Sequence, residues 1–379
     1  MKKKIIIVIS IVLILAVVGT IVSLVIIKNN KDNISQEESV NNITPVEEDV
    51  PEEEKPYVSN FEWEYDTPEN HNINADVFNQ IDSSIVNTEI TSSIIVKDGK
   101  ILYEYYKDGY DENSIFTIQS CSKSITSAIF GIAMDQGYFT DLDEPISNYF
   151  TQIQNSNNEY QKQITIRQLL MHTSGIKTTD DYSWETWRNS SNWIDYLLNS
   201  DVLTQPGTNF SYSTGNTHLL SYIIEQKTGK SLYDFGKEYL FDPIGMKTIQ
   251  CSTDPQGNAD GGNGFSLTAK DMARFGLLYL NNGIWDDRQV ISQNWITEST
   301  STQVFRSSTP DVANYGYQWW IRNFGTQGLH GYFAQGFGGQ FIFVVPDANL
   351  VVTFTSNYAD NRMYPYWQYV DDLVNACNI

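Results

Sequence analysis

The sequence predicts an α/β (α+β) fold in which an antiparallel sheet is flanked by helices and carries an inserted helical subdomain. Apolar segments typical of strands occur near both ends of the folded part, at residues 93–106 and 340–355. Between them, from about residue 141 to residue 270, apolar residues recur mostly at helical spacing. The chain has 379 residues, of which 41% are hydrophobic, so it can bury a large core.

Residues 1–27 predict a transmembrane anchor. Three lysines, Lys2 to Lys4, precede an unbroken run of apolar or small residues over 5–27. At about 1.5 Å per residue, a helical run of that length spans the roughly 30 Å hydrocarbon core of a bilayer. We therefore expect a single-pass protein of the cell membrane, with the lysines in the cytoplasm and the catalytic domain outside it. A cleaved signal peptide is the alternative, although no Ala-x-Ala-like site follows the run.

Residues 28–60 predict a disordered acidic linker, and residues 61–379 predict the folded domain. The linker is rich in Asn, Glu, Ser and Pro and contains the acidic run Glu52-Glu53-Glu54. The three cysteines match no metal-ligand spacing, so neither a metal nor a cofactor is expected. A formal net charge of −22 makes a nucleic acid a poor partner, because phosphates attract basic side chains.

Within the folded domain, strand and helix patterns follow one another along the chain. Asp98-Gly99 is a dipeptide typical of two-residue hairpin turns, so residues 93–106 are expected to form a hairpin. Near the end of the chain, residues 346–349 join two apolar strands. The predicted helices are 76–86, one that begins at residue 120, 166–170, 219–225, 269–280 and an aromatic helix that reaches about residue 376.

The segment Thr117-Ile118-Gln119-Ser120-Cys121-Ser122-Lys123 carries the candidate chemistry. The apolar residues after it trace one face of a helix that ends at Gly137. Ser120 would lie in the first turn, at the positive end of the helix dipole, with Lys123 on the same face. Burial disfavours the ammonium form of a lysine, so a buried amine can accept the serine proton. Such Ser-Lys pairs are an alternative to Ser-His-Asp.

A Ser-x-x-Lys spacing is weak evidence alone, because long chains contain such pairs by chance. Ser174 and Lys177 form a second pair. Gly175 follows that serine and no long amphipathic helix begins there, so Lys177 is not expected to stand over Ser174. Taken alone, Ser120 can also be interpreted as a helix N-cap beside a solvated lysine.

Several further segments resemble the β-lactamase-related serine hydrolases, which include class C β-lactamases, D-Ala-D-Ala peptidases and related esterases and amidases. The resemblance runs from about residue 93 to residue 357. It implies a β-lactamase/transpeptidase-like fold with Ser120 as the nucleophile. The segments that carry it, in the family's order, are Ile164-Thr165-Ile166-Arg167-Gln168-Leu169-Leu170-Met171-His172-Thr173-Ser174-Gly175, Phe210-Ser211-Tyr212-Ser213-Thr214, Pro243-Ile244-Gly245-Met246 and Ser266-Leu267-Thr268-Ala269-Lys270-Asp271-Met272-Ala273-Arg274-Phe275-Gly276.

The family's second motif implies that Tyr212 is the third catalytic residue, because its phenol can take part in the proton relay with the lysine. Thr214 stands where the family usually has Asn, so the resemblance implies that it contacts substrate through a hydroxyl but lacks the second amide donor. Tyr279 has the same spacing but ends an apolar helix and is expected in the core. No Gly-x-Ser-x-Gly elbow occurs, and His172 is expected to pack rather than to act as a base.

Two alignments are open for the third motif, which lines the opposite wall of the site. Ala334-Gln335-Gly336 would make the Phe337 amide an oxyanion donor beside the Ser120 amide, as in the branch similar to 6-aminohexanoate-dimer hydrolase. The other alignment uses His330-Gly331. We favour the first, because residues 336–340 lead straight into the predicted strand. Neither supplies the lysine with which the antibiotic-binding branches hold the substrate carboxylate. The resemblance therefore implies a neutral or amine-bearing acyl substrate rather than efficient β-lactam hydrolysis.

Together these features predict a serine hydrolase that cleaves an ester or amide through a Ser120 acyl-enzyme. The expected substrate is a small-molecule or cell-envelope acyl compound. The runner-up is a D-alanyl-D-alanine carboxypeptidase or penicillin-binding protein. The alternative from a different functional class is a binding protein of the cell envelope that keeps this fold but has no catalytic activity. The sequence does not predict the oligomeric state.

Overall fold

The computed structural model describes residues 57–309, 312–360 and 366–377. The predicted transmembrane anchor at residues 1–27 and the predicted linker up to residue 56 lie outside the described residues. Within the ranges that the structure describes, no helix is both long enough and apolar enough to cross a bilayer.

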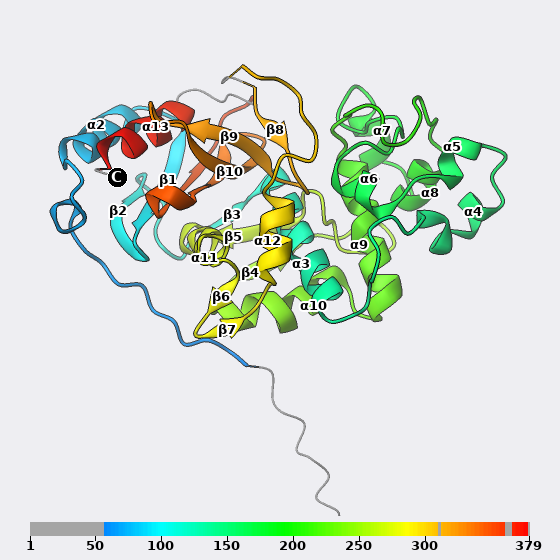
Figure 1. The fold of residues 1–379 in the computed structure, drawn as a ribbon, viewed down its shortest axis with the longest axis horizontal. Coiled ribbons are helices and arrows are strands. Elements are labelled where there is room, and N and C mark those ends of the chain that lie inside the picture. The colour runs from blue at the N-terminus through cyan, green and yellow to red at the C-terminus, as the bar shows by residue number, and fades with distance from the viewer. Residues whose placement is uncertain (1–56, 310–311, 361–365, 378–379) are drawn as a thin grey trace, which may run out of the picture. The chain divides into compact units, whose positions relative to one another are not determined.

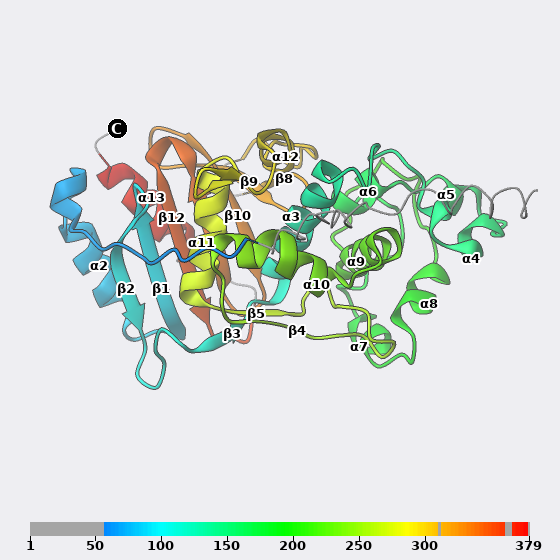
Figure 2. The same ribbon diagram turned by 90° about the horizontal axis from the view of Figure 1, so that it is seen from below.

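The described residues form a seven-stranded antiparallel sheet, which lies to the left in Figures 1 and 2. The strand order is β2-β1-β12-β11-β10-β9-β8, so strands from the two ends of the domain lie side by side. The sheet confirms the predicted fold class and hairpin. Its strands are β1 (Ile90–Lys97), β2 (Lys100–Tyr106), β8 (Asn314–Tyr315), β9 (Trp320–Phe324), β10 (Leu329–Gly336), β11 (Gln340–Val345) and β12 (Leu350–Ser356).

Helices cover both faces of this sheet (Figure 2). α2 (Asp76–Ile85) and α13 (Tyr366–Ala376) pack on one face, and α11 (Ala269–Leu280) packs on the other. The adjacent residues Ile94 and Ile95 of β1 point to opposite faces and join two different hydrophobic clusters. Burial on both faces explains why β1 and β12 carry almost only apolar or small side chains.

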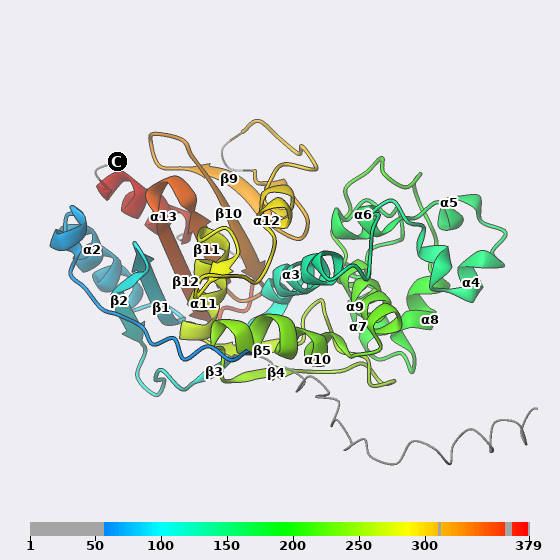
Figure 3. The same ribbon diagram turned by 60° about the horizontal axis from the view of Figure 1, so that its bottom comes forward.

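The predicted helical region lies beside the sheet and is drawn in green in Figures 1 and 3. Its helices are α4 (Thr151–Gln154), α5 (Glu159–Lys162), α6 (Ile166–Leu170), α7 (Trp184–Arg188), α8 (Trp193–Leu198), α9 (Thr214–Thr228) and α10 (Leu232–Gly236). The last part of the range 141–270 differs from the prediction. There β4 (Ile249–Cys251) and β5 (Phe265–Thr268) join β3 (Ile115–Thr117) in a small antiparallel sheet.

The folded domain begins before the predicted boundary at residue 61. The Tyr57 and Ser59 hydroxyls donate to Asp286 Oδ2 at 2.7 and 2.6 Å, and Ser59 is buried. Asp286 lies in the turn between β6 (Ile284–Trp285) and β7 (Arg288–Gln289), which precedes α12 (Gln293–Ser299). Residues 57–60 therefore belong to the domain, because their polar groups find partners on its surface.

Candidate active site

Ser120 lies in a 3₁₀ turn, Gln119–Cys121, that leads into α3 (Ser122–Asp135). Gln119 has φ of 50°, so the chain passes through the left-handed region directly before the serine. The Cys121 thiol is buried and donates to the Gln340 carbonyl of β11 at 3.4 Å. The turn is thus fixed to the sheet, and Ser120 stands at the start of a buried helix, as predicted.

Lys123 is fully buried and its side chain has three acceptors. Its Nζ lies 2.8 Å from Ser120 Oγ, 2.9 Å from Thr214 Oγ1 and 2.9 Å from the Gly262 carbonyl. Burial lowers the pKa of Lys123 to about 8, although the nearby charge of Asp180 opposes that shift. A substantial fraction of the amine is therefore neutral in mildly alkaline solution and can accept the Ser120 proton.

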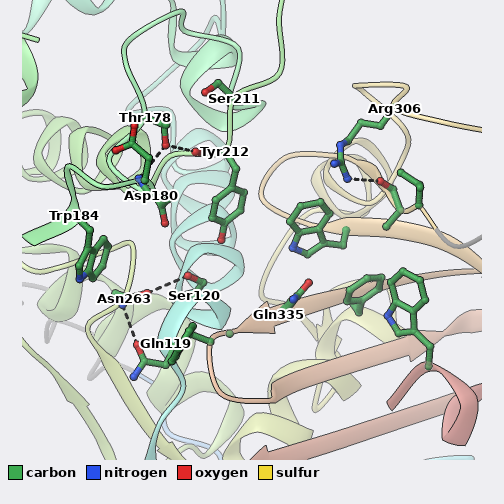
Figure 4. A pocket seen from close by; sticks show the side chains of 18 residues that line it. Gln119, Ser120, Thr178, Asp180, Trp184, Ser211, Tyr212, Asn263, Arg306 and Gln335 are labelled. Atoms are coloured by element: carbon green, nitrogen blue, oxygen red, sulfur yellow. Dashed lines mark hydrogen bonds between the residues drawn. The ribbon is translucent and has the colours of Figure 1, made fainter. Parts of the chain in front are cut away.

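Tyr212 lies against the same pair. Its phenol points toward Ser120 in Figure 4, and Lys123 Nζ is 4.9 Å from the ring centroid. Burial raises the pKa of Tyr212 well above its ordinary value, and Asp180 adds to the rise, while a hydrogen bond with Ser120 opposes it. The phenol therefore keeps its proton at neutral pH. Its ring stacks on Trp320, with centroids 5.6 Å apart.

Thr214 contacts Lys123 and Asp180, and its side chain is fully buried. Its hydroxyl accepts a hydrogen bond from Lys123 Nζ and donates to Asp180 Oδ1 at 2.7 Å. The hydroxyl has one proton, and its hydrogen bond to Asp180 occupies that proton. The arrangement therefore does not support the expected contact between Thr214 and substrate. Thr214 instead links the lysine to a carboxylate.

Asn263 is a site residue that sequence reasoning missed. Its Oδ1 accepts the Ser120 hydroxyl at 3.0 Å, and its Nδ2 donates to Gln119 Oε1 at 2.9 Å. The fully buried Asp260 carboxylate accepts the Asn263 N–H at 3.1 Å. These contacts hold the amide against the serine hydroxyl.

The glycine-rich run Asp260-Gly261-Gly262-Asn263-Gly264 is the signal that could have revealed this loop. A Cβ at Gly262 would lie 2.5 Å from Thr214 Cγ2, so glycine is needed for the loop to reach α9 and present its carbonyl to Lys123. Asp180 was also missed, and a single aspartate in a loop gives no comparable sequence signal.

Gly336 ends β10 directly beside the nucleophile turn. A Cβ at this position would lie 2.3 Å from the Ile118 carbonyl oxygen, so a larger residue would push the strand away from Ser120. Phe337 follows and lines the same pocket as Ser120, which makes the two backbone N–H groups candidate oxyanion donors. His330, the alternative, lies at the other end of β10 and lines a different hollow.

The second serine and lysine pair is not brought together. Ser174 is buried and donates to Asn216 Oδ1 at 3.0 Å, whereas Lys177 Nζ lies over the Tyr182 ring, 4.9 Å from its centroid. His172 is also buried, and neither ring nitrogen has a partner among the described residues. Its ring packs 4.7 Å from that of Tyr212, which agrees with the expected packing role.

Ser120 and Tyr212 open into a pocket of about 990 Å³. In Figure 4, Asp180 and Arg306 lie on opposite sides of the pocket, with Tyr212 and Ser120 between them. The other polar and aromatic residues that line it include Gln119, Asp181, Trp184, Asn263, Trp320, Phe333, Gln335, Phe337 and Trp367. Across the described ranges, no group of three or more His, Cys, Asp or Glu side chains could hold a metal ion.

The model of the Beta-lactamase family matches residues 91–376. The 6-aminohexanoate-dimer hydrolase of Paenarthrobacter ureafaciens is 25% identical over 291 residues, which cover 70% of this chain and 72% of that protein. Penicillin-binding protein 4 of Amycolatopsis lactamdurans is 24% identical over 287 residues, covering 65% of this chain and 72% of that protein.

Solved structures share the fold. A Bacillus anthracis protein assigned as a 6-aminohexanoate-dimer hydrolase superposes with a TM-score of 0.67 at 25% identity, covering 77% of this chain and 80% of its own. A D-stereospecific amidohydrolase from Streptomyces superposes with a TM-score of 0.62 at 17% identity, covering 78% of this chain and 97% of its own. The second likeness concerns the fold alone.

Proposed function

Since the chain belongs to the Beta-lactamase family of serine hydrolases, we propose that it cleaves an amide or ester bond through an acyl-enzyme formed on Ser120. The observation that carries this proposal is the buried Lys123, whose Nζ lies 2.8 Å from Ser120 Oγ and whose pKa is lowered to about 8. A lysine so placed is a base for the serine hydroxyl.

In the proposed acylation, neutral Lys123 takes the proton of Ser120, and Oγ forms a bond to the substrate carbonyl carbon. The backbone N–H groups of Ser120 and Phe337 stabilise the resulting oxyanion. When the bond to the leaving group breaks, Tyr212 donates its proton to the departing nitrogen or oxygen and regains one from the Lys123 ammonium. Water then attacks the acyl-enzyme by the reverse relay and releases the acid.

The pocket favours an acyl group that is neutral or carries an amine. Asp180 and Asp181 place negative charge on one side of it. At the third motif, Gln335 stands before Gly336 and supplies no cation. A cationic amine near the acyl carbonyl would therefore be stabilised, whereas an anionic group on that side would be repelled.

Labelling by a fluorophosphonate probe tests the nucleophile. The full-length chain in detergent should be labelled and should hydrolyse short p-nitrophenyl esters, and Ser120→Ala should abolish both activities. Ser83→Ala, on the exposed side of α2, is the matched serine control. Absence of labelling and turnover in the unaltered chain would favour the silent envelope-binding protein. Stable acylation by a fluorescent penicillin would favour the carboxypeptidase.

We also propose that the catalytic domain works outside the cytoplasm on a cell-envelope substrate such as a D-alanyl ester or peptide. The lysines and the apolar run of residues 1–27 support this location. Protease added to intact cells should then digest the domain of a membrane-bound chain. Full protection on intact cells, or lack of activity on all D-alanylated envelope material, would remove this part of the proposal.

A further inference from the structure

We infer that Asp180 and Thr214 are positioning residues, which turn the lone pair of the neutral Lys123 amine toward Ser120 and away from its other neighbours. They act through the direction of hydrogen bonds and need not touch the substrate. This inference deepens the proposed function and rests on it, because it explains how the proposed base is aimed at the proposed nucleophile.

The Lys123 amine has three hydrogen-bond neighbours among the described residues, and its ammonium form suits all three. Nζ lies 2.8 Å from Ser120 Oγ, 2.9 Å from Thr214 Oγ1 and 2.9 Å from the Gly262 carbonyl. An ammonium has three N–H groups and no lone pair, so it can donate to each of them. The Ser120 hydroxyl meanwhile donates to Asn263 Oδ1 at 3.0 Å. In this state the serine proton points away from the lysine.

Loss of one proton leaves the amine with two N–H groups and one lone pair, so one of its neighbours must change from acceptor to donor. Gly262 presents a backbone carbonyl, which cannot donate. Ser120 and Thr214 each present a hydroxyl, which can either accept or donate after a rotation. The lone pair could therefore face either hydroxyl, but only the pairing with Ser120 leads to acylation.

Asp180 removes this ambiguity, because it occupies the one proton of the Thr214 hydroxyl. Its Oδ1 accepts that hydroxyl at 2.7 Å, and a carboxylate has no proton to return. Its Oδ2 accepts the backbone N–H of Thr214, in the first turn of α9, and the Thr179 hydroxyl at 3.1 Å. These contacts hold the carboxylate in place. Thr214 can then only accept from Lys123, so the lone pair of the neutral amine faces Ser120.

The carboxylate matters because position 214 carries a threonine. An asparagine, which the family usually has there, could offer Lys123 an amide oxygen, and an amide oxygen only accepts. A threonine hydroxyl behaves in the same way only while a second group holds its proton. Asp180 and Thr214 together thus provide what one amide oxygen could provide alone.

Asp180→Asn tests this role in the full-length chain. The new amide oxygen should face the Thr214 backbone N–H, which cannot change direction, so the amide nitrogen should donate to Thr214 Oγ1. The Thr214 hydroxyl is then free to donate to the Lys123 lone pair and competes with Ser120. The measurement is the plateau rate, defined as the rate of labelling by a neutral fluorophosphonate at a pH well above the pKa of Lys123. It should fall about fivefold, the typical effect of one competing hydrogen bond. An unchanged plateau rate would overturn the inference, because Asp180 would then act through its charge alone.

Substitutions of Thr214 separate the direction of the hydroxyl from packing. Thr214→Ser keeps the hydroxyl and should retain most of the plateau rate. Thr214→Val keeps the shape but removes the acceptor, and should lower the plateau rate about fivefold. Thr297→Val, on the exposed side of α12, is the matched control and should have no effect. Equal losses in the serine and valine variants would show that only packing matters, which would contradict the inference.

A double-variant cycle measures how far the two residues depend on each other. In a Thr214→Asn chain an amide oxygen can face Lys123 without help, so adding Asp180→Asn should lower the plateau rate by less than about twofold. The same loss in both backgrounds would mean that Asp180 acts by another route. Absence of Ser120 labelling in the unaltered chain would contradict the proposed function and this inference together. Normal labelling with an unchanged plateau rate in Asp180→Asn would contradict this inference alone.

Discussion

At the level of single residues, the proposed mechanism makes the reaction of Ser120 depend on the titration of Lys123. The amine must be neutral to accept the serine proton, and burial sets its pKa near 8. The charged groups that act on it are Asp180 and Asp260, which favour the ammonium form, and Arg188, which disfavours it. The rate of acylation should therefore rise with pH to a plateau.

The first prediction concerns this profile. The rate of labelling by a neutral fluorophosphonate should increase with a midpoint near pH 8. Asp180→Asn removes a negative charge that stabilises the ammonium, so the pKa of Lys123 should fall and the midpoint should move to lower pH. Asp372→Asn, on α13, serves as the control with an unchanged midpoint. A shift of the Asp180→Asn midpoint to higher pH would contradict the assignment of Lys123 as the base.

The second prediction concerns Gly336. Gly336→Ala places a methyl group 2.3 Å from the Ile118 carbonyl, so β10 must move and carry the Phe337 N–H away from the oxyanion position. Loss of one such donor lowers kcat by roughly a hundredfold or more. Ser83→Ala, on the exposed side of α2 and outside the pocket, is the control and should keep full kcat. Retention of full kcat in Gly336→Ala would place the donor elsewhere.

Local periodicity and motif resemblance could predict only part of the site. Ser120 and Lys123 are three residues apart on one helix, so helical spacing alone brings them together. Asn263 meets Ser120 across 143 positions, and no local pattern encodes that contact. Thr214 was predicted to contact the substrate, because the Asn that the family usually has at this position does so. In this chain the Thr214 hydroxyl instead donates its hydrogen bond to Asp180.

Among the elements, α7 reaches from the helical region to the loop that carries Asn263. Arg188 at its end pairs with the buried Asp260 carboxylate, and its guanidinium carbon lies 3.9 Å from the Trp193 ring centroid. Asp260 in turn accepts the Asn263 N–H. The helix therefore supports the serine from a distance through a chain of polar contacts.

The third prediction is that Arg188→Met destabilises the protein by roughly 3 kcal/mol, because it leaves a buried carboxylate without its counter-charge. The exposed part of Arg188 will reduce this value somewhat. Adding Asp260→Asn to that variant removes the unpaired charge and should recover much of the free energy of unfolding, measured by urea denaturation. A double variant no more stable than Arg188→Met would show that the ion pair has little energetic role.

Element prediction succeeded where a pattern was long and failed where it was short. β1, β11 and β12 each present five or more buried apolar or small positions, so their strands could be located from sequence. β4 and β5 have three and four residues, too few for an alternating pattern to emerge. Their pairing with β3 depends on contacts far apart in the chain.

For the whole molecule, the dominant physical property is its charge. The chain carries 46 acidic and 24 basic residues. Such a surface attracts cations over distances of about a Debye length. The order of the layers followed from the sequence, because strand patterns lie at both ends and helical patterns between them. Part of the pocket wall could not be predicted, because Asp180, Asn263 and Arg306 lie in loops.

The fourth prediction follows from that charge. The kcat/KM value of an ester with a cationic acyl group should fall as sodium chloride is raised to about 0.3 M, because salt screens the attraction to the protein. A neutral ester of equal size is the internal control and should change little. Parallel responses of the two esters would mean that long-range attraction does not contribute to capture.

The pairing of β1 with β12 also has a consequence for biosynthesis. Ile94 of β1 lies opposite Thr353 of β12. During translation, β1 therefore lacks this neighbouring strand until some 260 further residues have been synthesised. A ribosome-bound chain that has not yet emerged past Leu350 exposes β1 as an open edge, the kind of surface that chaperones protect. Ser120 is synthesised early, yet Gly336 reaches it only near the end of translation. In the proposed mechanism, a chain that has not yet reached Phe337 therefore lacks the second oxyanion donor beside Ser120.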